Sequence, residues 1–69
     1  MNVAANRIID ALGGTTAVSR LAETPPSTVH SWRRIGIPSS RLAHLRLAVK
    51  AEGLPVDIDS LAAVHEAAA

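Results

Sequence analysis

The chain of 69 residues contains no cysteine and only one aromatic residue, Trp32. Disulfide bonds and thiolate ligands for zinc are therefore excluded as supports for a small fold. The three histidines, at positions 30, 44 and 65, lack the i, i+4 spacing that places two imidazoles over one metal ion. We expect no metal site and no cofactor. A chain this short buries little surface on folding, so self-association is the favoured source of further burial.

Long hydrophobic runs are also absent. Polar residues interrupt the N-terminus, and every apolar segment is far shorter than a membrane span. We therefore expect no signal peptide and no membrane association, and the lack of cysteine agrees with a reducing cytoplasm. Ala and Leu are abundant, whereas aromatic and alternating β-branched residues are scarce, which predicts an all-α fold.

The net charge of +1 conceals an uneven distribution along the chain. Every formal charge between positions 25 and 51 is positive, and every one from position 52 onward is negative. This arrangement gives one end of the molecule an attraction for polyanions and keeps the other end away from them. For a charge run considered alone, an ordinary solvated surface is the alternative.

Hydrophobic spacing and capping residues predict five helical segments in one domain that spans residues 1–69. The expected ranges are 3–12, 16–23, 26–34, 39 or 40 to 51, and 60–67. The expected core lies within residues 3–51, and a C-terminal helical segment occupies residues 57–69. The expected N-caps are Thr15 or Thr16 for the second helix, Ser39 or Ser40 for the fourth, and Asp57 or Asp59 for the fifth.

Residues 15–34 are the most informative stretch, because two short helical patterns flank a break at Thr24-Pro25-Pro26. Pro26 excludes Pro25 from the α region, so Pro26 should be the first residue of the second helix. Val29 and Trp32 face inward, three residues apart, and leave a polar outer face. This pattern is typical of a helix-turn-helix that places its second helix in the major groove of DNA.

The candidate DNA-contacting residues lie on that polar face and at the starts of the neighbouring helices. They are Thr15, Thr16, Pro26, Ser27, Thr28, His30, Ser31, Arg33, Arg34 and Arg41. An arginine can bind guanine through two hydrogen bonds or hold a phosphate, and a histidine can contact a phosphate or a base edge. Capping alone also explains the threonines, and a solvated face also explains Arg41. Trp32 is expected in the core against Ile8 or Leu45, with stacking in an interface as the alternative.

The segment that ends at residue 51 is apolar on two sides. Leu42, Leu45 and Val49 form one stripe, which is expected to face the core. A second stripe lies roughly opposite. With Leu54, or with the pair Leu61 and Val64, this stripe is either covered by the C-terminal helix or exposed to a second subunit of a homodimer. The candidate interface residues are Ala43, Leu47, Ala51, Leu54 and Leu61.

The segments GGTTAVSRLA (13–22) and PPSTVHSWRR (25–34), followed by Gly36-Ile37-Pro38, resemble the small Cro-like or YdaS-like helix-turn-helix proteins of bacteria and prophages, in the lambda-repressor-like superfamily. The resemblance covers residues 4–50. It implies a compact bundle of four or five helices and a repressor of transcription, often a homodimer. It also allows an antitoxin that represses its own operon.

The turn departs from the family pattern at three positions. This chain has Ser19, Glu23 and Thr24 where the family usually has Ala, Gly and an apolar residue. A positive φ at Glu23 costs on the order of 1 kcal/mol or more. By the same resemblance, the recognition surface consists of Pro26, Ser27, His30, Ser31 and Arg34.

No nucleophile elbow, Gly-rich phosphate loop, paired-carboxylate motif or metal cluster appears in the sequence, so we expect no enzyme. The expected function is a sequence-specific DNA-binding regulator, most simply a repressor, that binds a palindromic operator as a dimer in the nucleoid of the cytoplasm. One alternative is an autorepressing antitoxin with a toxin partner. Another is an adaptor that binds RNA polymerase or another regulator through the segment that ends at residue 51; that binding should depend little on salt.

Overall fold

The computed structural model describes residues 2–61, and all regular secondary structure in that range is helical. The helices are α1 (Val3–Ala11), α2 (Thr15–Leu21), α3 (Pro26–Ile35) and α4 (Ser39–Glu52). A short helical segment follows at residues 58–61. The predicted all-α class is confirmed. Most of the predicted C-terminal helix 60–67 lies outside the described residues.

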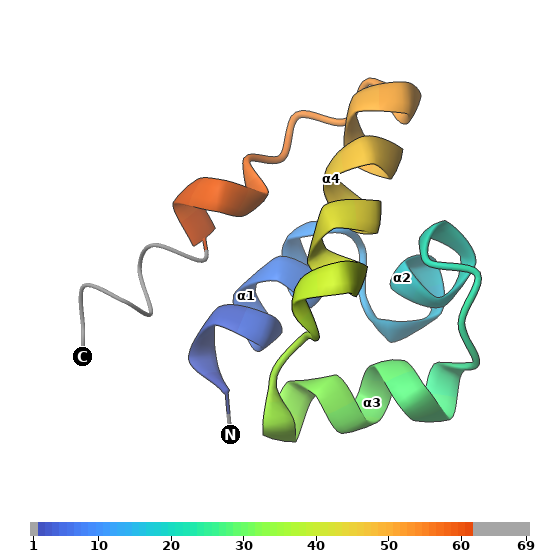
Figure 1. The fold of residues 1–69 in the computed structure, drawn as a ribbon, viewed down its shortest axis with the longest axis vertical. Helices are drawn as coiled ribbons and strands as arrows, with labels where there is room; N and C mark the ends of the chain where they lie inside the picture. The colour runs from blue at the N-terminus through green and yellow to red at the C-terminus, as the bar shows by residue number, and fades with distance from the viewer. Residues whose placement is uncertain (1, 62–69) are drawn as a thin grey trace.

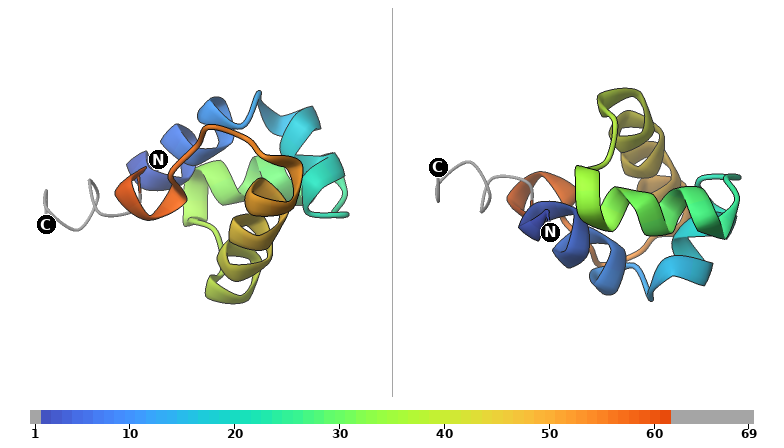
Figure 2. Two further views of the ribbon diagram at one scale, coloured as in Figure 1. Left: turned by 90° about the horizontal axis from the view of Figure 1, so that it is seen from above. Right: turned by 90° about the horizontal axis from the view of Figure 1, so that it is seen from below.

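The helices form a small bundle in which α1, α2 and α3 pack against one another. α3 runs along the lower side of the molecule, and α4 rises from the end of α3 at a steep angle (Figure 1). After α4 the chain returns towards α1, where residues 58–61 lie (Figure 1). The view from below shows α3 across the underside, with its length open to the outside (Figure 2).

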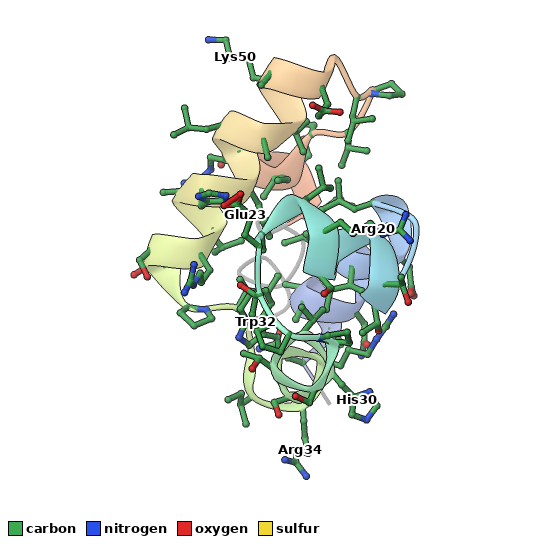
Figure 3. All side chains as sticks on the ribbon, turned by 90° about the vertical axis from the view of Figure 1, so that its right-hand side faces the viewer. Arg20, Glu23, His30, Trp32, Arg34 and Lys50 are labelled. Atoms are coloured by element: carbon green, nitrogen blue, oxygen red, sulfur yellow. The ribbon has the colours of Figure 1, made fainter. Side chains whose placement is uncertain are left out.

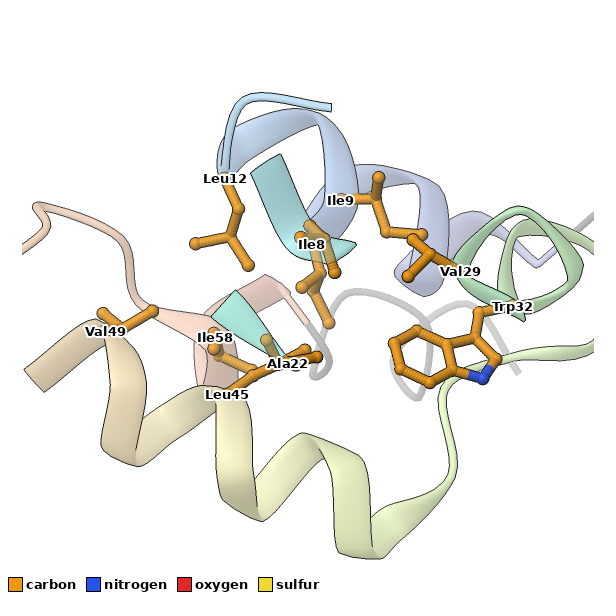
Figure 4. Close-up of a cluster of buried hydrophobic side chains, with 10 residues drawn as sticks. Ile8, Ile9, Leu12, Ala22, Val29, Trp32, Leu45, Val49 and Ile58 are labelled. Carbon is orange, nitrogen blue, oxygen red and sulfur yellow. The ribbon is translucent and has the colours of Figure 1, made fainter. Parts of the chain in front are cut away.

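One hydrophobic cluster joins all of these elements (Figure 4). Its buried residues are Ile8, Ile9, Leu12, Val18, Ala22, Val29, Trp32, Leu45, Val49 and Ile58. The predicted inward positions on α3 and α4 are confirmed, and Trp32 is 3% exposed within the same cluster as Ile8 and Leu45. Ile58 is 3% exposed, so the core extends beyond the range 3–51 that the sequence indicated.

The start of α1 is fixed to the end of α3. The side chain of Asn2 caps α1 by accepting a 2.9 Å hydrogen bond from the Ala5 N–H. The N–H of Asn2 donates a 2.9 Å hydrogen bond to the carbonyl oxygen of Arg33. A Cβ at Gly36, which has φ +97°, would lie 2.9 Å from the Asn2 side-chain nitrogen. A glycine is therefore required where α3 ends beside Asn2.

Two predicted caps are wrong. The N-cap of α2 is Gly14, and both threonines lie inside the helix, where their hydroxyl groups do not cap it. The N-cap of α4 is Pro38, whose backbone carbonyl accepts hydrogen bonds from Arg41 and Leu42, so neither serine caps that helix. In both cases the residue before the expected cap already has the extended ψ that begins a helix.

The connection between α2 and α3 spans residues 22–25 and is held by polar side chains. Glu23 has a φ of 51°, the left-handed conformation. The Ser19 hydroxyl donates to the carbonyl oxygen of Thr24 at 2.6 Å, and the Thr24 hydroxyl donates to the carbonyl oxygen of Ala22 at 2.9 Å. Pro25 lies outside α3 with φ −56° and ψ 143°, as predicted.

The chain after α4 is fixed by two aspartates with different roles. The Asp57 carboxylate accepts hydrogen bonds from the Ser60 N–H at 3.2 Å and from the Ser60 hydroxyl at 2.9 Å, and so caps residues 58–61. These bonds hold the pKa of Asp57 below its ordinary value of 3.8. Asp59 instead accepts from the Arg46 Nε at 2.7 Å. Of the two predicted caps, Asp57 is therefore the cap. Within residues 2–61, no helix has both the length and the hydropathy to cross a membrane.

Candidate nucleic-acid interface

The outer side of α3 carries exposed polar residues, because Val29 and Trp32 on the opposite side of the helix pack into the core. Their spacing of three residues directs the intervening positions outward. The side chains of His30 and Arg34 extend away from the molecule, whereas Trp32 points inward (Figure 3). We name this surface the α3 face, and it consists of the exposed residues Pro26, Ser27, Thr28, His30 and Arg34.

Ser31 differs from the rest of its predicted group. Its side chain is half-buried, and its hydroxyl donates a 3.2 Å hydrogen bond to the carbonyl oxygen of Ser27, one turn earlier. A serine bonded in this way keeps its lone pairs available as acceptors. Ser31 therefore lies at the edge of the α3 face, with its proton engaged in the helix.

Arg33 is not on the α3 face, although the sequence grouped it with Arg34. Its guanidinium donates hydrogen bonds to side chains of α1 and α2: to Thr15 Oγ1 at 3.2 Å, Asn6 Oδ1 at 2.8 Å and Asp10 Oδ1 at 2.9 Å. Its side chain is 19% exposed. The side chain is therefore already bonded inside the protein, and its predicted contact with DNA stays a prediction.

The residues predicted at the starts of the neighbouring helices are placed differently from one another. Thr15 is half-buried, and its hydroxyl oxygen accepts the hydrogen bond from Arg33 Nε. Thr16 is exposed on the first turn of α2. Arg41 is exposed on the first turn of α4, after residues 36–38 connect it to the end of α3. Thr15 is therefore bonded directly to α3 through Arg33. Among the described residues, the side chains of Thr16 and Arg41 form no hydrogen bond or ion pair with α3.

The positive segment 25–51 divides into paired and unpaired charges. Arg33 pairs with Asp10, and Arg46 pairs with Asp59 from the acidic C-terminal part. Among the described residues, Arg34 and Arg41 form no ion pair. Lys50 lies at the end of the molecule opposite Arg34 (Figure 3). The acidic segment therefore neutralises charge on α4, and the α3 face keeps its positive charge.

A separate groove lies between α4 and the chain that follows it. Its volume is about 550 Å³, and it is lined by Arg46, Leu47, Val49, Lys50, Leu54, Val56, Asp57, Ile58 and Asp59. Leu47, one of these lining residues, is 69% exposed. Residues 57–61 therefore do not cover Leu47.

The predicted dimer stripe is divided by the fold. Ala43 and Ala51 are exposed with Leu47, but Leu54 and Leu61 are half-buried and pack against the core. The chain after Gly53 turns back towards the cluster around Ile58 and partly covers both leucines, although Leu54 also lines the groove. Their place in a dimer interface stays a prediction.

Ile35 was not identified from the sequence, yet it is 71% exposed in the last turn of α3, next to Arg34. Apolar residues in an amphipathic helix ordinarily face the core. The available signal was that Val29 and Trp32 already occupy the inward positions of this helix. An isoleucine outside that pair therefore had to lie at the border of the polar face.

Within the described range 2–61, no three His, Asp or Glu side chains gather closely enough to hold a metal ion. Comparisons of the chain with protein-family models, with curated proteins and with solved structures found no match.

Proposed function

We propose that this chain is a sequence-specific DNA-binding regulator in which α2, residues 22–25 and α3 act as a helix-turn-helix. The observation that carries the proposal is the α3 face: a polar surface whose Arg34 forms no ion pair with residues 2–61, on a helix that lies along the outside of the molecule (Figure 2). The major groove of B-DNA, about 12 Å wide, admits such a helix.

The residues of the α3 face suit contacts with base edges and phosphates. Arg34 offers the paired donors that match guanine or a phosphate, and His30 can donate to either. Ser27 is short enough to let the helix approach closely, and Thr28 adds a hydroxyl beside it. Arg41 and Thr16 extend the contact to the DNA backbone in this proposal. The lambda-repressor-like, Cro-like assignment is part of the same proposal and rests on the segments 13–22 and 25–34.

Ile35 adds an apolar contact at the border of the α3 face. An exposed aliphatic side chain in the major groove can contact the C5-methyl group of thymine, which is a sequence-specific feature. Replacing single thymines by deoxyuridine in a bound site removes only that methyl group. If no such replacement distinguishes the wild-type protein from Ile35→Ala, the contact does not exist.

We further propose that the protein binds a palindromic site as a homodimer, because one short helix contacts only a few base pairs. The groove on α4 suits a second copy. Leu47 is exposed and lines this groove together with basic and acidic residues. A two-fold axis places the same patch on both subunits, so Leu47 of each copy can enter the groove of the other, with Lys50 facing acidic residues.

Repression follows from this binding alone, because a protein that occupies a promoter excludes RNA polymerase. The proposal requires no catalysis and no cofactor, and it places the protein at the nucleoid. An antitoxin role adds a toxin as partner and uses the same DNA contact. An adaptor that binds RNA polymerase or another regulator through the exposed Leu47 is the second candidate, and the open groove is the observation that favours it.

Selection from a pool of random DNA duplexes tests the proposal. We expect one enriched, two-fold symmetric sequence, bound more tightly than a shuffled duplex in fluorescence anisotropy. The affinity should fall steeply with salt concentration, because phosphate contacts release counterions. Failure to enrich any sequence would reject the DNA-binding function. Salt-insensitive capture of a protein partner that Leu47→Glu abolishes would favour the adaptor.

A further inference from the structure

Arg33 and Arg34 are adjacent in α3 but have opposite surroundings. Arg34 is exposed on the α3 face, whereas the guanidinium of Arg33 makes hydrogen bonds to three side chains of α1 and α2. The backbone carbonyl of Arg33 also accepts from the N–H of Asn2, the cap of α1. One residue near the end of α3 is therefore bonded to both preceding helices.

The arrangement of these bonds restrains the rotation of α3 about its own axis. Asn6 and Asp10 lie one turn apart on α1, and their side-chain oxygens accept hydrogen bonds from the two terminal nitrogens of the guanidinium. The Nε–H donates to Thr15, the first residue of α2. A planar group held by acceptors from two helices has one orientation. A lysine ammonium at the same position has a single nitrogen and cannot meet three separated acceptors.

We infer that Arg33 is a positioning residue: it fixes the orientation of α3, and hence where Arg34 and His30 point, without contacting DNA itself. The inference rests on the proposed function. Its physical basis is the ion pair with Asp10 at 2.9 Å and the low exposure of the Arg33 side chain, 19%. The three bonds use three of the five N–H donors of Arg33, and a phosphate at this guanidinium would be repelled by the carboxylate of Asp10.

The two possible roles of Arg33 predict opposite effects for Asp10→Asn. A positioning arginine loses its ion pair with Asp10 and keeps only a neutral amide acceptor there, so affinity for the selected duplex should fall by up to about five-fold. Affinity for a shuffled duplex should stay equal or rise, because one negative charge is gone. If Arg33 instead contacted DNA, weakening its contact with residue 10 would strengthen binding to the selected duplex, and that result would overturn the inference.

Glu52→Gln is the matched control, because it removes the same charge from the exposed last residue of α4. It measures the general effect of one carboxylate on DNA affinity. The comparison with Asp10→Asn therefore isolates the contact with Arg33. Both variants are compared by circular dichroism at the temperature of the binding measurement, so that only folded protein is considered.

Arg33→Lys supplies an independent readout because it keeps the positive charge. We expect the slope of log affinity against log salt to be unchanged, while the ratio of selected to shuffled affinity falls about five-fold or more. A phosphate contact at this position would largely survive the change to lysine, so an unchanged ratio would overturn the inference.

The wild-type protein provides a readout that does not depend on how the variants fold. In NMR spectra, the Nε–H signal of Arg33 should be unchanged when the selected duplex is added, whereas that of Arg34 should shift. A large shift of the Arg33 signal alone would overturn the inference. If neither signal changes and no duplex is preferred by the wild type, the proposed function fails, which is a distinct result.

Discussion

The hydroxyl of Ser19 donates a 2.6 Å hydrogen bond to the carbonyl oxygen of Thr24, across the turn in which Glu23 has a φ of 51°. This bond and the one from Thr24 to Ala22 hold the chain between α2 and α3 with Glu23 in the left-handed region. The polar residues of the turn stabilise a conformation that glutamate disfavours. The turn therefore contains a strained residue, and the strain can be measured.

Glu23→Gly should stabilise the protein by about 1 kcal/mol, because glycine adopts a positive φ without the Cβ clash. For a domain of this size, that corresponds to a rise in Tm of about 4–8 °C in a thermal melt followed by circular dichroism. Glu23→Ala is the matched control, since it removes the same charge but keeps the Cβ. Equal melting temperatures for the two variants would show that the turn is not strained at this residue.

The sequence predicted the parts of the structure that depend on local spacing. Val29 and Trp32 were placed in the core because three residues separate them on a helix, and Pro26 was placed at the start of α3 because its ring restricts Pro25. Arg33 and Arg34 were grouped together, since each is a basic residue on the same helix. Their difference depends on Asn6 and Asp10, which approach from α1 only in the folded chain.

The same distinction applies to the leucines near the C-terminal end. Leu47 was correctly expected on the side of α4 away from the core, because helical spacing fixes its direction relative to Leu45. Leu54 and Leu61 follow Gly53, whose φ of 65° ends the helix. The direction of the chain after Gly53 depends on packing against Ile58. It therefore cannot be predicted from the spacing of residues along the sequence.

Arg34→Ala and His30→Ala should each weaken binding to the selected duplex by roughly 1–3 kcal/mol without changing the melting temperature. Both side chains extend from the α3 face and make no contact that the core requires (Figure 3). Lys50→Ala removes a positive charge at the opposite end and serves as the control in fluorescence anisotropy. Equal affinities for the three variants would show that the α3 face is not the DNA-binding surface.

Trp32→Ala should act through stability, because the indole is 3% exposed in the core cluster. Truncating a buried aromatic residue costs about 3–5 kcal/mol, which is close to the whole stability of many small domains. Circular dichroism should show lost helix or a much lower Tm. Trp32→Phe keeps most of the buried volume and should remain folded. A normal melt with lost DNA binding for Trp32→Ala would instead place the indole in the interface.

Asp57→Ala should lower the Tm at neutral pH, because residues 58–61 lose the carboxylate that accepts the Ser60 N–H. The pKa of Asp57 is lower in the folded chain than its ordinary value of 3.8, so the carboxylate stabilises the fold above that pH. This advantage is lost as the pH falls through the folded-state pKa. Asp57→Asn keeps an acceptor that does not titrate, so the difference in Tm between Asp57→Asn and Asp57→Ala should be independent of pH. Thermal melts from neutral to acidic pH test both expectations, and a wild-type advantage over Asp57→Ala that is unchanged in acid would contradict the first.

Leu47→Glu should separate the proposed dimer into folded monomers. Leu47 is 69% exposed, so a glutamate at this position costs little in the monomer. A two-fold contact uses the same patch twice, so the variant removes the apolar side chain of each subunit and adds two carboxylates to a groove that already contains Asp57 and Asp59. Light scattering should report the mass of one chain, and binding to the palindromic duplex should become weaker and non-cooperative.

Val3→Glu is the control for assembly, because Val3 is also an exposed apolar residue, 51% exposed, but lies on α1. It should leave the dimer intact. A wild-type protein that is monomeric both free and on DNA would contradict the two-fold contact. If Leu47→Glu unfolds the chain, Leu47 packs within its own subunit, because a charge at an open surface has no such effect. A variant that remains dimeric would place the contact between subunits elsewhere on the molecule.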